Sequence, residues 1–237
     1  MPVVLDHENH IYTNTDTDEQ YTSVTTFIGL FKKPFDSDFW SKQVARREKV
    51  SQQTILDKWK DVTKIACDRG TKIHLVMEDW IKDKKVEHEY KDLAESFTKK
   101  TSFIINNDSV INSEILLYNH DHKLAGTADM IVENKNFFHV LDFKTNKKFN
   151  YHSKYNEYYY PPIDHLSHCE HNTYGIQMSM YAYMHELISG KKCAGLKILY
   201  LNEFKGKRFW QEIPCNYMKD TVKSMFDYRL QKLNEIK

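Results

Sequence analysis

The sequence predicts an α/β fold in which a central mixed β-sheet is flanked by helices. Apolar residues recur at helical spacing through most of the first third of the chain. Apolar and β-branched runs separated by polar turns fill the middle, and helix-like and strand-like segments then alternate to the end. The order is helices, three strands, a helix, two strands and a helix, and segments in this order pack as helices on a sheet.

Length and composition are those of a single folded domain. The chain has 237 residues, 41% of them hydrophobic and 14% aromatic, which is enough to bury a core. It has no repeat and no Pro-, Gly- or Ser-rich linker, so we expect one domain over residues 1–237, mainly helical in 1–110 and sheet-containing in 111–237. No apolar run is long enough to cross a bilayer and no secretory signal is visible, so we expect a cytoplasmic protein without a membrane partner.

Charge and cysteine content exclude few functions. A net charge of +1, from 34 Lys and Arg against 33 Asp and Glu, neither favours nor opposes a nucleic-acid partner. The cysteines form no CxxC pair, which argues against a disulfide framework, a zinc ribbon or an iron–sulfur cluster. They are Cys67, Cys169, Cys193 and Cys215.

The N-terminal part is expected to be helical after a short extended start. Residues 21–28 are rich in β-branched side chains and fit a strand or the lead-in to a helix. The Arg69-Gly70 pair predicts the end of one helix, because glycine commonly follows a helix C-terminus. The expected helices are one capped by Ser37 or Asp38, one through 55–66, one from residue 71 and one over 93–105.

The remaining chain alternates between strand and helix patterns. Residues 133–136 form a polar turn between two strands, and a Tyr- and Pro-rich irregular segment covers 149–173. The expected strands are residues 113–119, 124–132, 137–144, 196–201 and 208–213. The expected helices are 174–188 and an amphipathic C-terminal helix from about Met218.

Two aspartates and a lysine on neighbouring strands are the sharpest feature of the sequence. Asp142 and Lys144 are two residues apart and therefore share one face of their strand. Asp129 lies on the preceding strand, and a short turn between antiparallel strands can bring it close to Asp142. Adjacent carboxylates repel unless a cation binds between them, and Mg²⁺ prefers such ligands together with phosphate. A lysine beside them can steady a phosphate oxygen, so the pattern predicts a phosphodiester-hydrolysing centre.

Each candidate residue also has an ordinary structural interpretation. An isolated Asp-x-Lys is common and forms a weak ion pair on a half-exposed strand. His74 fits a capping or partly buried histidine, and Glu114 an acid at a strand edge. Gln177 and Tyr181, one helical turn apart, fit a helix that packs into the core. The functional interpretation therefore rests on their occurrence together.

Five short motifs occur in one order along the chain. They are R-G-T-x-x-H at 69–74, S-E-x-x-L at 113–117, G-x-A-D at 126–129, D-x-K-T at 142–145 and Q-x-x-x-Y at 177–181. In this order they resemble the RecB-type branch of the PD-(D/E)XK nuclease superfamily, over residues 21–181. The resemblance implies a restriction-endonuclease-like core. Relatives include stand-alone phage exonucleases and the mitochondrial genome maintenance exonuclease.

The resemblance implies a role for each matching residue. Mg²⁺ or Mn²⁺, as one or two ions, would be held by His74, Asp129, Asp142 and the backbone carbonyl of Phe143. The catalytic residues would be Asp129, Asp142, Lys144 and Glu114. The residues expected to contact DNA are Gln177, Tyr181, Thr145, Arg69 and Lys147. Several relatives hold an iron–sulfur cluster through four cysteines whose spacing this chain lacks, so we expect no such cluster.

Local basic pairs and a tyrosine-rich segment suggest how a strand could be held. Lys32-Lys33 and Lys147-Lys148 are able to meet phosphates. Five tyrosines crowd residues 151–160, and aromatic rings near lysines suit stacking on unpaired bases. Each of these tyrosines could equally pack the loop down with its hydroxyl in water.

The sequence therefore predicts a Mg²⁺- or Mn²⁺-dependent DNA exonuclease that prefers single-stranded ends. The resemblance places it in DNA recombination, repair or replication, with a possible recombination or replication protein as partner. A phage-encoded protein would act in the host cytoplasm. Two alternatives stay open: a DNA or RNA endonuclease on the same fold, and a non-catalytic DNA-binding accessory protein.

Overall fold

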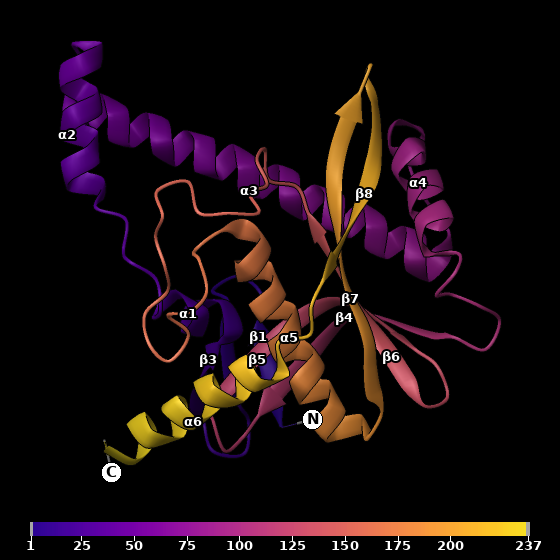
Figure 1. Ribbon diagram of the computed structural model, residues 1–237. Helices are drawn as coiled ribbons and strands as arrows, with labels where there is room; N and C mark the ends of the chain where they lie inside the picture. The colour runs from indigo at the N-terminus through magenta and orange to yellow at the C-terminus, as the bar shows by residue number, and fades with distance from the viewer. Residues whose placement is uncertain (1, 236–237) are drawn as a thin grey trace.

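The computed structural model describes residues 2–235 and contains a mixed eight-stranded β-sheet between two groups of helices (Figure 1). The strands are β1 Val3–Asp6, β2 Ile11–Asn14, β3 Glu19–Ser23, β4 Val110–Asn119, β5 Leu124–Glu133, β6 Phe137–Lys144, β7 Lys192–Phe204 and β8 Lys207–Cys215. They are ordered β1-β2-β3-β5-β6-β7-β8, and β4 pairs with β5. The β3–β5 and β6–β7 pairs are parallel and the others antiparallel. The predicted fold class is confirmed.

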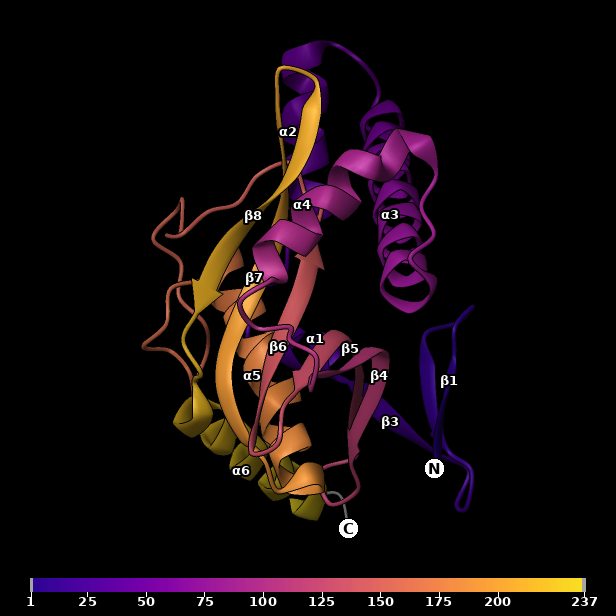
Figure 2. The same ribbon diagram turned by 90° about the vertical axis from the view of Figure 1, so that its right-hand side faces the viewer.

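Helices cover both faces of the sheet (Figure 2). They are α1 Val24–Gly29, α2 Ser37–Glu48, α3 Gln52–Asp83, the short 3₁₀ helix η1 His88–Tyr90, α4 Lys91–Thr101, α5 Glu170–Ser189 and α6 Lys219–Glu235. Side chains of α1, α5 and α6 form one core with the sheet, and side chains of α3 and α4 form a second core on the opposite face. None of these helices, within residues 2–235, is both long and apolar enough to span a membrane.

Alternation of side chains along the strands supplies both cores. On β5, Ile131 belongs to the core under α5, whereas its neighbours Met130 and Val132 belong to the core under α3. On β6, Val140 and Leu141 divide in the same way. Successive strand residues point to opposite faces, so a sheet covered on both sides reads as a continuous apolar run.

The extended start comprises three strands, and residues 21–28 are divided between β3 and α1. The expected cap of the next helix was wrong. Asp36, rather than Ser37 or Asp38, caps α2 by accepting a hydrogen bond from the Phe39 N–H at 2.8 Å. Three oxygen-bearing side chains in a row gave the sequence pattern no means of choosing among them.

The predicted break at Gly70 was also wrong, because α3 continues through it as one helix of 32 residues. A Cβ atom at Gly70 would lie 3.3 Å from the Thr145 Oγ1 atom. The glycine therefore permits a close approach between α3 and the end of β6, rather than ending the helix. The first half of α3 extends with α2 beyond the sheet (Figure 1).

Gly126 on β5 permits a second close approach, to the Tyr181 ring on α5. A Cβ atom at Gly126 would lie 2.7 Å from Tyr181 Cε1, which is closer than two carbon atoms can approach without displacing one of them. We expect Gly126→Ala to lower the free energy of unfolding by about 1–3 kcal/mol through overpacking. Urea denaturation measures this, with Gly29→Ala as control because nothing lies within 4 Å of the added methyl group there. Equal stability of the Gly126→Ala variant and the wild type would contradict the packing described.

Candidate active site

Three adjacent strands bring three carboxylates side by side. The pairs Ser113–Met130 and Ile115–Ala128 place Glu114 of β4 opposite Asp129 of β5. On the other edge of β5, Met130 pairs with Leu141, so Asp142 of β6 follows next to Asp129. The predicted hairpin between β5 and β6 is therefore present, and it sets the two aspartates next to each other.

Glu114 has an unusual backbone for a strand residue. Its φ angle is +49°, in the left-handed region that non-glycine residues rarely adopt. The pairing of β4 with β5 is interrupted at this residue and resumes on both sides. Strain of this kind persists only where the surrounding structure enforces it, and it commonly occurs at functional sites.

His74, on α3, lies close to the carboxylates of Glu114 and Asp129. Its Nδ1 atom lies 3.5 Å from Asp129 Oδ1. Its Nε2 atom lies 3.1 Å from the backbone oxygen of Phe143, which accepts the hydrogen bond. One ligand atom each from His74, Glu114 and Asp129 lie within 4.8 Å of one another. We call these three residues the acidic cluster.

The charges of the acidic cluster are unbalanced. Burial, followed by repulsion from Asp129, raises the pKa of Glu114 to about 7. Burial opposes the protonation of His74, but Asp129 and Asp142 outweigh it and raise the pKa of the imidazole. Asp129 is also buried, yet its contacts with His74, Lys144 and the Phe143 N–H keep its pKa below the usual value. Asp129 Oδ2 accepts that N–H bond at 2.7 Å.

Lys144 and Asp142 form a buried ion pair beside the acidic cluster. Lys144 Nζ lies 2.5 Å from Asp142 Oδ2, with side-chain exposures of 16% and 3%. Burial and the nearby Asp129 raise the pKa of Asp142 to about 6 although Lys144 opposes this, whereas the carboxylates outweigh burial and raise the pKa of Lys144. Lys144 is therefore an ammonium group at neutral pH, suited to donate hydrogen bonds rather than to accept a proton.

The donor set of the acidic cluster fits a divalent cation. One imidazole nitrogen and two carboxylate oxygens converge there, and the Phe143 carbonyl lies beside them. Oxygen-rich sets with one nitrogen suit Mg²⁺ and Mn²⁺. A doubly charged ion would also relieve the repulsion that raises the pKa of Glu114. Asp142 is paired with Lys144, and its role as a ligand stays a prediction.

Gln177 and Tyr181 lie on one face of α5 and contact each other. The Gln177 side-chain amide donates to the Tyr181 hydroxyl at 3.1 Å. Tyr181 is only 3% exposed and packs against Gly126. Tyr181 is therefore placed to orient Gln177 from inside the core, and the half-buried Gln177 is the member of the pair with solvent access.

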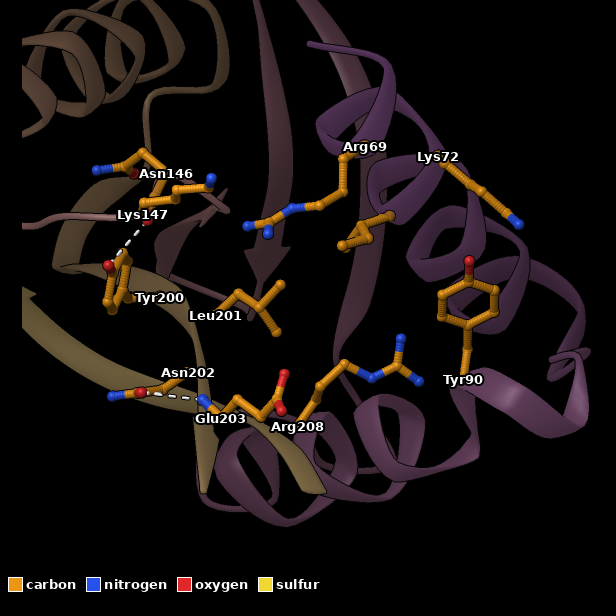
Figure 3. Close-up of a pocket in the computed structure, with 11 residues that line it drawn as sticks. Arg69, Lys72, Tyr90, Asn146, Lys147, Tyr200, Leu201, Asn202, Glu203 and Arg208 are labelled. Atoms are coloured by element: carbon orange, nitrogen blue, oxygen red, sulfur yellow. Dashed lines mark hydrogen bonds between the residues drawn. The ribbon is translucent and has the colours of Figure 1, made fainter. Parts of the chain in front are cut away.

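Thr145 and Lys147 directly follow β6, and Arg69 approaches them from α3. Arg69 donates a hydrogen bond from its guanidinium group to the backbone oxygen of Thr145. Arg69 and Lys147 line a cavity of about 610 Å³ between α3 and the strands β7 and β8 (Figure 3). Tyr200 also lines it and donates through its hydroxyl to the Asn146 backbone oxygen at 2.8 Å. Of the expected DNA-contacting residues, Arg69 and Lys147 therefore line this cavity, Thr145 lies beside Arg69, and Gln177 and Tyr181 lie on α5.

Tyr174 is a site residue that the sequence analysis missed. Lys144 Nζ lies 4.6 Å from the centre of its ring, within the range of a cation–π interaction. Tyr174 precedes Gln177 by three residues and Tyr181 by seven, so all three share one face of α5. That spacing is visible in the sequence and could have identified it.

Comparisons with known proteins leave the family open. The sequence matches no protein-family profile and no curated protein. Among solved structures, the crystal structure of SSO0001 is 13% identical with a TM-score of 0.35, covering 89% of this chain and 75% of that one. A protein described as "Putative exonuclease" from Eubacterium rectale is 10% identical with a TM-score of 0.34, covering 88% of this chain and 69% of that one. Neither score carries an argument about this chain, so the resemblance to RecB-type nucleases stays a prediction from motifs.

The raised pKa of Glu114 implies a pH dependence of stability. The folded protein keeps the Glu114 proton up to about pH 7, whereas the unfolded chain loses it near the ordinary glutamate value. The folded state is therefore stabilised at low pH, and this contribution is lost as the pH rises from about 4.5 to about 7. The expected loss of stability is on the order of 1 kcal/mol, because the carboxyl group is partly solvated. In the Glu114→Gln variant this pH-dependent loss should be absent.

Urea unfolding at about pH 5 and about pH 8, with a chelator present, measures that difference. Glu8→Gln, a change at an exposed glutamate outside the site, is the control. The same loss of stability in wild type and Glu114→Gln would show that Glu114 does not titrate as described.

Proposed function

We propose that this protein is a metal-dependent DNA exonuclease that hydrolyses phosphodiester bonds and prefers single-stranded ends. The observation that carries the proposal is the acidic cluster with the Lys144 ammonium group beside it. The order of the five motifs supports DNA as the substrate and recombination, repair or replication as the setting. No helix of residues 2–235 could span a membrane.

His74, Glu114 and Asp129 would hold Mg²⁺ or Mn²⁺, with the Phe143 carbonyl as a further ligand. A divalent ion supplies Lewis acidity, which polarises a phosphoryl oxygen and lowers the pKa of a water molecule. The Phe143 N–H fixes the Asp129 carboxylate, leaving its other oxygen, Oδ1, toward His74. Each ligand is thus positioned by the sheet or by α3.

Lys144 would act on the phosphate itself. Its raised pKa keeps it charged, so it can donate to a phosphoryl oxygen and offset the negative charge that develops there. Asp142 on one side and the Tyr174 ring on the other fix the ammonium group. Gln177, oriented by Tyr181, offers an amide close to the same face. In this arrangement Tyr181 is a positioning residue, and Asp142 positions Lys144 in addition to its predicted role as a metal ligand.

Removal of the Lys144 ammonium group or of the Asp129 carboxylate should strongly slow cleavage. We expect Lys144→Met and Asp129→Asn each to lower the rate of DNA hydrolysis by about 10²–10⁴-fold, because each removes a group that stabilises the transition state or holds the metal. The assay follows an end-labelled linear single strand with Mg²⁺, Mn²⁺ or EDTA. Lys223→Met, at a half-exposed lysine on α6, is the matched control.

Two further substrates, a circular single strand and an RNA strand, decide between the alternatives. Cleavage of the linear strand with a circular single strand left intact supports an exonuclease. Cleavage of the circle would indicate an endonuclease, and faster cleavage of RNA would change the substrate class. Wild-type rates in Lys144→Met, or cleavage in EDTA, would contradict the proposed mechanism.

A further inference from the structure

Two hollows adjoin the candidate active site on the side of the irregular segment 149–169. The first has a volume of about 480 Å³ and ends at Tyr174. The second has a volume of about 730 Å³ and lies against the start of α2. The residues common to both hollows are Tyr155, Glu157 and His168. We call the two together the aromatic groove; its inner end lies at the Tyr174 ring that contacts Lys144.

Large aromatic side chains stand exposed along the outer part of this groove. Phe35 is 67% exposed, Phe39 48%, Trp40 50% and Tyr155 72%. Phe39 and Trp40 hold each other edge to face, with ring centres 5.2 Å apart. Exposed apolar residues scattered singly need no explanation, but four partly exposed rings around one hollow form a large apolar surface in contact with solvent.

Lysines without carboxylate partners line the inner part. Lys32 is half-buried, and within residues 2–235 no carboxylate lies within 4.0 Å of its ammonium group. Burial lowers the pKa of Lys32, and the negative charge of Glu170 opposes this only in part. Lys154 lies over the Tyr155 ring, at 5.4 Å from the ring centre. A buried charge without a partner is costly, so this position favours an anion from outside the chain.

The acids of the groove are already engaged. Asp36 caps α2 through the Phe39 N–H. Glu157 lies 3.8 Å from Lys33. Glu170 accepts a hydrogen bond from the Asn150 side chain at 2.9 Å. None of them lies within 4.0 Å of the Lys32 ammonium group, and the groove therefore offers aromatic rings beside a half-buried lysine that has no ion-pair partner within residues 2–235.

From this combination we propose that the aromatic groove binds the single-stranded DNA that leads away from the cleaved bond. The Lys32 ammonium group meets a backbone phosphate, and the rings of Phe39, Trp40 and Tyr155 stack on unpaired bases further out. The inference rests on the proposed function for the identity of the strand. Stacking on aromatic rings is tolerant of sequence, so the groove accepts any base order.

The tyrosine-rich segment divides between two roles. Tyr159 is 2% exposed, and its hydroxyl bonds to Thr173 at 2.7 Å, so it packs the segment down. Tyr155 is exposed and lines both hollows. Of this pair, only Tyr155 is placed to stack on a base.

Binding is measured apart from cleavage. Fluorescence anisotropy of a labelled oligothymidylate of about twelve nucleotides, in EDTA, gives the dissociation constant. We expect Phe39→Ala/Trp40→Ala to weaken binding at least about tenfold, since the stacking of two bases together contributes that much or more. Phe204→Ala, at an aromatic side chain 66% exposed on the β7–β8 hairpin, should bind as the wild type does.

Lys32→Met tests the phosphate contact. We expect the slope of log K against log salt to fall in magnitude by about 0.7, the value for one phosphate contact on a single strand. Lys32→Arg, which keeps the positive charge, should have the wild-type slope. If Lys32 had only a structural role, the salt slope would be the same in Lys32→Met and the wild type. Circular dichroism of each variant confirms that it is folded.

Hydrolysis of thymidine 5′-(p-nitrophenyl phosphate), which is too small to reach the outer groove, separates the two proposals. Its unchanged rate in Phe39→Ala/Trp40→Ala, with weakened oligonucleotide binding, supports the groove. Equal oligonucleotide binding by the wild type and the double variant contradicts the proposed role of the groove, at any rate of hydrolysis of the small ester. No hydrolysis of the small ester by wild type, with any metal, counts against the proposed function instead. Tighter binding of RNA than of DNA of the same sequence overturns the assignment to DNA.

Discussion

Mutual repulsion among Glu114, Asp129 and Asp142 is the constraint on which the rest of the site depends. The strand registers fix these carboxylates next to one another, whatever their charge. Two positive groups, His74 and Lys144, lie beside Asp129 and Asp142, and these carboxylates raise the pKa of each. Asp142 is matched by Lys144, whereas Glu114 stays unmatched and keeps its proton to about pH 7. A divalent cation bound there would favour the ionised form of Glu114 and displace its proton.

Several features of the fold serve to hold that arrangement. An uninterrupted α3 carries His74 to the sheet, and Gly70 lets this helix approach the end of β6. Gly126 lets Tyr181 lie against β5, from where it fixes Gln177. Both glycines lie in regular elements, where glycine normally costs stability, and close packing against the site is the physical reason for each.

The local part of the site could be predicted from the sequence, and the long-range part could not. Asp129, Asp142 and Lys144 lie on a hairpin, where strand period and a short turn determine neighbours. The approach of His74 to Glu114 depends on how α3 crosses the sheet, and no local sequence pattern indicates that. Gly70 was misinterpreted for the same reason, since its neighbour Thr145 is distant in the sequence. The ion pair between Asp142 and Lys144 likewise could not be predicted, because it depends on the burial of both side chains in the folded structure.

The most direct test of the account is a titration with Mn²⁺ followed by electron paramagnetic resonance, in the absence of DNA. The wild type should bind Mn²⁺ at the acidic cluster, and His74→Ala and Asp129→Asn should each weaken that binding at least about tenfold, as loss of a ligand does. Asp220→Asn, an exposed acid on α6, should leave it unchanged. Identical binding curves for wild type and both ligand variants would contradict the claim that these residues form a metal site.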